Sequence, residues 1–77
     1  MKLGCVVGSV WATKKCGSLA GQIFMCVECE GERIVAADLV GAGEGDRVIL
    51  AFGGAARLEK CVPVDAAIIA ILDESEV

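Results

Sequence analysis

Residues 3–13, LGCVVGSVWAT, decide the fold that the sequence predicts. The segment follows a period of two, so odd-numbered side chains share one side of an extended backbone and even-numbered ones share the other. This period is typical of a β-strand and not of a helix. Gly4 and Gly8 fall on the same side, where the missing side chains let the strand bend or let another backbone come close, as a barrel wall requires.

Working outward, the rest of the chain predicts four more strands separated by turn signals. They cover residues 22–28, 33–38, 47–52 and 66–72. The turn Glu30-Gly31-Glu32 joins the first two into a short hairpin. Residues 55–60, AARLEK, are the only stretch with sustained helix preference, enough for one or two turns. We therefore predict one all-β domain over residues 1–77: a small five-stranded antiparallel barrel, OB-like, with one short helix and no open sheet edges.

Length and hydropathy predict that this domain associates with neighbours. The chain has only 77 residues, yet 56% of them are hydrophobic and the mean hydropathy is +0.69. A domain of this size buries a small core, so surplus apolar surface is available for contact with other subunits. Apart from residues 3–12, the longest apolar stretches are residues 48–56 and 66–72. All are shorter than the roughly 20 residues of a membrane-spanning helix, and we expect no membrane partner.

Missing residue types narrow the function. The sequence contains no histidine, which removes imidazole metal ligands and every histidine-assisted nucleophile. The formal net charge is −4 and the only adjacent basic pair is Lys14-Lys15, too little positive charge to neutralise a run of phosphates. We expect a protein that is not an enzyme, binds no nucleic acid and carries no cofactor.

Five cysteines suggest a second interpretation. Their odd number, without an export signal before them, indicates a reducing cytoplasm. Cys26 and Cys29 form a C-x-x-C pair, but on a strand they point to opposite faces. A zinc site would need further ligands from Cys5, Cys16, Cys61 or carboxylates. Buried or incidental thiols are therefore the main interpretation, and a small metal or redox module centred on Cys26 and Cys29 is the alternative.

The glycine loop at residues 41–45 and Trp11 each have a ligand-binding interpretation. Gly41-x-Gly43-x-Gly45 resembles a phosphate-binding loop, but a strand follows it, so the helix dipole of such a site is missing. We interpret this segment as a tight loop that lets subunits approach one another. Trp11 is assigned to core or interface packing, because a single-stranded nucleic-acid barrel needs more stacking aromatics and a positive groove.

Arg57 has two interpretations. It is either a solvated side chain or a clamp whose planar guanidinium holds Asp65 or Asp38 across a subunit boundary, where the pair would fix register and orientation.

Taken in order, several motifs resemble one family. They are GSVWATKK at residues 8–15, LAG at 19–21, VAADLVGAGEGD at 35–46, GGAAR at 53–57 and PVDAAIIAILD at 63–73. This ordered set is similar to the EutN/CcmL shell proteins, which form the vertices of bacterial microcompartments. Two features differ from the family pattern: the hairpin turn at residues 30–32 is short, and no further C-terminal strand follows, so we expect the contacts of that strand to be absent or replaced.

The resemblance implies a five-stranded barrel with one short helix, assembled as a homopentamer. Such pentamers cap the corners of a cytoplasmic protein shell whose facets are tiled by hexameric shell proteins of an unrelated fold. The resemblance also implies residues at the subunit interface or axial pore. These are Gly41, Ala42 and Gly43 near the ring axis or its contacts, and Gly53, Gly54, Ala55, Ala56 and Arg57 between subunits. Asp65 joins this set from the clamp interpretation, as one of the two carboxylates that Arg57 could hold.

Overall fold

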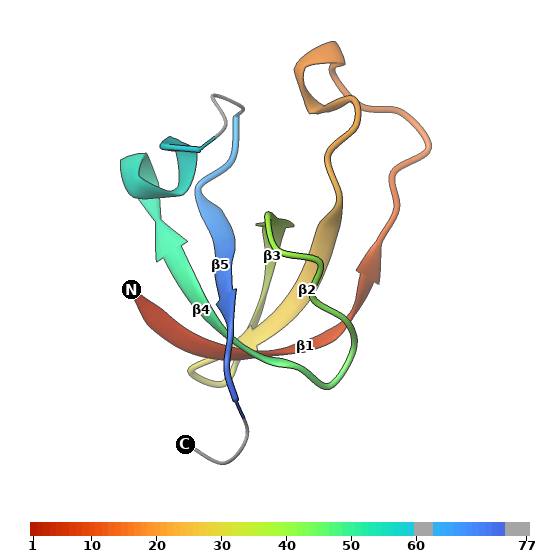
Figure 1. Ribbon diagram of the computed structural model, residues 1–77. Coiled ribbons are helices and arrows are strands. Elements are labelled where there is room, and N and C mark those ends of the chain that lie inside the picture. The colour runs from red at the N-terminus through yellow and green to blue at the C-terminus, as the bar shows by residue number, and fades with distance from the viewer. Residues whose placement is uncertain (60–62, 74–77) are drawn as a thin grey trace.

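Five strands close into a barrel in the computed structural model, which describes residues 1–59 and 63–73. The strand order around the barrel is β1-β2-β3-β5-β4 (Figure 1). The elements in chain order are β1 (Lys2–Val10), the 3-10 turn η1 (Gly17–Leu19), β2 (Phe24–Cys29), β3 (Glu32–Asp38), β4 (Arg47–Phe52), the 3-10 turn η2 (Gly53–Arg57) and β5 (Ala66–Ile71). The predicted all-β barrel is confirmed.

One strand pairing differs from the predicted antiparallel pattern. Four neighbouring pairs are antiparallel, whereas β3 and β5 pair in parallel, with Ala37 opposite Ala67 and Asp38 opposite Ile68. The cause is arithmetic: a closed ring with an odd number of strands cannot alternate direction at every step. The parallel pair is the seam at which the barrel closes.

The element boundaries differ from the predictions by one residue at four strand ends and by more at the positions that follow. β1 ends at Val10 and β2 begins at Phe24, so the chain between them is longer than predicted. The predicted helix at residues 55–60 is the 3-10 turn η2, which starts two residues earlier and ends at Arg57, while Lys60 lies outside the described residues. No helix in the described part of the chain is long and apolar enough to cross a bilayer.

The core lies inside the barrel and uses the inner faces of the strands. Its largest side chains that are no more than 1% exposed are Leu50, Ile68, Val6, Val27 and Val48. The inner face of β1 carries Val6 and also Gly4, where a Cβ would lie 2.6 Å from Val27 Cγ1 and 3.0 Å from Leu50 Cδ1. Gly4 is therefore required for close packing, whereas a Cβ at Gly8 would meet nothing within 4 Å.

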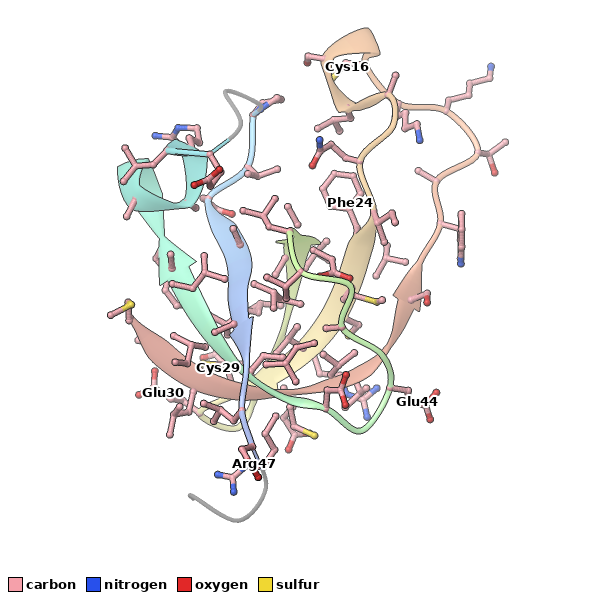
Figure 2. All side chains as sticks on the ribbon, in the orientation of Figure 1. Cys16, Phe24, Cys29, Glu30, Glu44 and Arg47 are labelled. Carbon is pink, nitrogen blue, oxygen red and sulfur yellow. The ribbon has the colours of Figure 1, made fainter. Side chains whose placement is uncertain are left out.

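Residues 11–23, which we call the arm, extend away from the barrel between β1 and β2 (Figure 1). Figure 2 shows Cys16 at the outer end of the arm and Phe24 where the arm joins the barrel. Hydrogen bonds inside the arm fold it around η1: the N–H of Leu19 donates to Cys16 O (3.0 Å) and that of Ala20 to Gly17 O (3.0 Å). The arm thus has local order but contributes little to the barrel core.

Candidate subunit interface

An apolar groove of about 560 Å³ lies on the barrel side where β1 begins. Its lining combines the start of the chain, the residues that follow β3, parts of β4 and β5, and η2 with the two residues after it. The lining residues are Met1, Leu39, Val40, Ala51, Ala55, Leu58, Glu59 and Ile69. We call this feature the groove. Met1 and Leu58 are 86% and 84% exposed, so large apolar side chains face solvent at its rim.

η2 presents Leu58 because its opposite side is anchored to the barrel. Ala56 is 3% exposed and packs in a small cluster with Ala37 and Ala67. The turn begins at Gly53, whose φ of +62° is in the left-handed region that favours glycine. With Ala56 facing inward, Leu58 is directed outward, and one anchored turn therefore exposes a leucine at the groove.

Two hydrogen bonds tie η2 to the segment that leads into β5. The N–H of Gly53 donates to Asp65 O at 2.9 Å, and Arg57 Nη1 donates to Val64 O at 2.8 Å. Arg57 thus holds a backbone carbonyl of its own chain, and not the carboxylate of Asp65 or Asp38. Its predicted carboxylate contact across a subunit boundary stays a prediction.

The glycine-containing loop that follows β3 is shaped by two aspartates. Asp38 Oδ1 accepts hydrogen bonds from the N–H groups of Val40 (3.1 Å) and Gly41 (3.0 Å). Asp46 Oδ2 accepts one from the N–H of Gly43 at 2.8 Å. Asp38 therefore fixes the path of Val40, which lines the groove, at the point where β3 ends.

We expect replacing Asp38 with alanine to lower the free energy of unfolding by about 1–2 kcal/mol, because two backbone N–H groups lose their acceptor. The amides of Val40 and Gly41 should also exchange hydrogen faster. Asp38→Asn keeps the Oδ1 acceptor and is the matched control, with a smaller loss. Equal urea midpoints for the alanine variant and the unmodified chain would contradict this assignment.

The predicted interface residues divide into buried and exposed groups. The side chains of Ala42 and Ala56 are 5% and 3% exposed and belong to the core of their own chain. Gly43 is half-buried, while the other six are exposed: Gly41, Gly53, Gly54, Ala55, Arg57 and Asp65. Of the nine, only Ala55 lines the groove. Their role between subunits stays a prediction.

The cysteines do not gather at one site. Cys29 is buried in the core and Cys26 is half-buried on the other face of β2, as their spacing predicts. Cys5 is half-buried and Cys16 is exposed, whereas Cys61 lies outside the described residues. Within residues 1–59 and 63–73, no group of three or more cysteine, aspartate or glutamate side chains is placed to hold a metal ion. The metal or redox alternative therefore gains no support from the geometry.

The base of the arm carries a second exposed apolar surface. It surrounds a smaller hollow of about 50 Å³ whose lining residues are Val10, Trp11, Ala12, Lys15, Gln22, Ile23 and Phe24. Trp11 is 87% exposed and Ile23 is 54% exposed. The interpretation of Trp11 as a core residue of its own chain is therefore wrong, and interface packing remains.

The ion pair between Lys2 and Glu30 shifts the pKa of the lysine. The ammonium of Lys2 hydrogen-bonds to the Glu30 carboxylate, and this contact raises the pKa of Lys2 above its ordinary value of 10.5. The same ammonium lies 5.5 Å from the centre of the Phe52 ring. Because the pKa is raised, the stabilisation is fully present below pH 10.5 and is lost as the pH rises through the folded-state pKa. Lys2 is therefore charged at neutral pH, next to Met1 of the groove.

Sequence reasoning missed most of the groove. Leu58 was assigned to a helical turn, and Met1, Val40 and Ile69 were not assigned to any site. Two signals were available: Leu58 is an apolar residue between the charged Arg57 and Glu59, and the predicted glycine loop begins beside Val40. Neither signal shows that these residues meet, because their positions depend on closure of the barrel.

A small barrel with exposed apolar surfaces on two sides is a protein built to associate with other subunits. The family model described as "Ethanolamine utilisation protein EutN/carboxysome" matches residues 1–73. The chain belongs to this EutN/CcmL family.

Relatives of known function support this family assignment over nearly the whole chain. The carboxysome shell vertex protein CcmL of Thermosynechococcus vestitus is 39% identical, over 95% of this chain and 84% of its own. The bacterial microcompartment shell vertex protein GrpN of Rhodospirillum rubrum is 36% identical, over 99% and 97%. The solved structure of GrpN from that organism, a pentameric microcompartment shell protein, has a TM-score of 0.85 and covers 95% of this chain and 93% of its own.

Proposed function

We propose that this protein is a structural shell protein whose homopentamers cap the vertices of a bacterial microcompartment in the cytoplasm. The observation that carries the proposal is the agreement with shell vertex proteins in sequence and in fold over at least 95% of the chain. The family match over residues 1–73 supports a single domain.

Symmetry explains why such a unit is needed. A flat sheet of hexamers closes into a polyhedral shell only where five-fold units replace six-fold ones. Each copy in a five-fold ring uses two different surfaces, one toward each neighbour, and the contact closes on itself when the rotation between copies is right. The groove and the base of the arm supply two such surfaces on this chain. Hexameric shell proteins are the second class of partner.

The proposed role is non-catalytic and depends on shape. The groove is lined mainly by aliphatic side chains, and the sequence contains no histidine for acid–base chemistry. A formal net charge of −4 and the absence of a basic surface run in the sequence favour protein partners over nucleic acid.

The interface in this proposal includes the loop from Gly41 to Gly43 and the turn η2. Gly41 and Gly53 have φ angles of +80° and +62°, and both are exposed, so a neighbour can approach their backbones closely. Ala42 and Ala56 then act by holding these segments on the barrel and not by direct contact. Arg57 is the last residue of η2, and Asp65 O accepts a hydrogen bond from the N–H of its first residue, Gly53. Both Arg57 and Asp65 are exposed, so a neighbouring carboxylate or guanidinium can reach them.

Native mass spectrometry together with light scattering after size exclusion tests the proposal. The expected particle contains five copies of the 7.9 kDa chain. A monomer that persists at high concentration, or a ring with another number of copies, would overturn it. Co-expression with a hexameric shell protein adds a functional readout: closed polyhedral particles are expected with this chain, and open sheets or tubes without it.

A further inference from the structure

We infer that the ring forms head to tail, with Trp11 at the base of the arm of one copy seated in the groove of the next copy. This inference rests on the proposed homopentamer and names the two surfaces that meet in it. The occupant of the groove is thus a second copy of this chain.

The base of the arm exposes large apolar side chains that are not buried against their own chain. Trp11 is 87% exposed and Ile23 is 54% exposed, although both are large apolar side chains. The backbone hydrogen bonds of η1 stay within the arm, and the N–H of Asp38 donates to Ile23 O at 2.8 Å, which joins the base of the arm to β3. Tryptophan in a well-packed pocket is among the residues that carry most binding energy at protein interfaces.

The groove has a suitable size and lining to take up such a side chain. Its volume of about 560 Å³ is within the range of pockets that enclose a large side chain and its neighbours. Aliphatic side chains dominate the lining, and Leu58 at 84% exposed is available to cover an indole ring. The base of the arm and the groove therefore both present apolar side chains, and the groove has room for the exposed indole of Trp11.

The two surfaces have different lining residues and lie at different positions on the barrel. β1 begins next to the groove at Met1 and runs through Lys2–Val10 to Trp11, where the arm starts (Figure 1). A strand of this length separates its ends by up to roughly 30 Å. Trp11 is 87% exposed and does not line the groove of its own chain, so in this inference the groove is filled by another copy. A contact between two different surfaces generates a ring when the rotation between copies closes.

One pair of opposite charges favours the same pairing. Among the described residues that line the groove, Glu59 has the only charged side chain. Among those at the base of the arm, Lys15 has the only one. Docking Trp11 in the groove brings these opposite charges to the rim of one contact, where they favour the correct orientation.

Fluorescence of Trp11 tests the contact directly, because it is the only tryptophan in the sequence. On assembly, we expect the emission to shift to shorter wavelength as the exposed indole becomes buried. Leu58→Asp in the groove should prevent both assembly and the shift. A pentamer whose tryptophan emission remains that of an exposed indole would overturn the inference and leave the homopentamer intact.

Mixing of two variants tests whether the contact is head to tail. Trp11→Ala and Leu58→Asp should each weaken association by about 30-fold or more and give mainly monomers. Together they should form a one-to-one heterodimer, because the intact arm of the second variant fits the intact groove of the first. Circular dichroism checks that both barrels are folded, and Val35→Ala, at a 51% exposed position outside both surfaces, is the control that keeps the pentamer.

Charge reversal tests the orientation. Lys15→Glu and Glu59→Lys should each weaken the pentamer, and the double variant should regain stability. Unchanged pentamers for Trp11→Ala and Leu58→Asp, or a double charge variant no better than the single ones, would overturn the inference. A wild-type chain that is not pentameric would instead overturn the proposed function, so the two failures are distinguishable.

Discussion

Replacing Gly4 with alanine is expected to lower the free energy of unfolding by roughly 1–3 kcal/mol. The new Cβ would lie 2.6 Å from Val27 Cγ1 and 3.1 Å from the carbonyl oxygen of Glu28. Val27 is fully buried and its β-branched side chain is stiff, so it cannot rotate away, and the carbonyl belongs to the neighbouring strand. Relief requires β1 and β2 to move apart.

Gly8→Ala is the matched control, because the same substitution in the same strand meets no atom within 4 Å. Alanine also reduces the conformational entropy of the unfolded chain, so this variant should be unchanged or slightly more stable. Both variants are compared by urea unfolding at one protein concentration, since the stability of an oligomer depends on concentration. Equal midpoints for the two variants would contradict the assigned packing of Gly4.

Replacing Ile68 with alanine is expected to cost roughly 2–5 kcal/mol, the larger of the two effects. Ile68 is fully buried and lies at the seam of the barrel, opposite Leu50 on β4 and Asp38 on β3. The cavity left by its side chain would adjoin both pairings of β5. We therefore expect the parallel β3–β5 pair to open earlier than the rest of the sheet.

The graded control is Ile68→Val, which removes one methylene and should cost about 0.5–1.5 kcal/mol. Thermal and urea unfolding give the order of stability, and hydrogen exchange of the Leu39 amide, which donates to Ile68 O at 3.3 Å, reports on the seam. If the alanine variant were as stable as the valine variant, Ile68 would not close the core as its burial indicates.

Much of the fold could be predicted because strand signals are local. The limits predicted for residues 47–52 agree with β4, Arg47–Phe52, and the predicted hairpin turn at residues 30–32 joins β2 and β3. The boundaries predicted for the strands on either side of the arm were less accurate. The period of two continues past Val10, but extended pairing needs a partner strand, and β2 begins only at Phe24.

The candidate site was predicted only in part. The glycine loop after residue 40 was predicted to adopt backbone conformations that favour glycine, and Gly41 and Gly45 have φ angles of +80° and +90°. The groove was not foreseen, because its lining comes from distant parts of the sequence, including Met1, Val40 and Ile69. The sequence predicted that Trp11 packs either in the core or at an interface. Its side chain is 87% exposed, which excludes packing in the core of its own chain.

The sequence by itself determined the class of fold and the family, because alternation, turn residues and an ordered set of motifs are properties of neighbouring positions along the chain. Only the tertiary structure decided which apolar residues are buried and which are exposed. Ile68 is fully buried and Ile69 is 37% exposed, although they are adjacent and identical in type. The difference arises because barrel closure directs the side chain of Ile68 into the core and that of Ile69 into the groove.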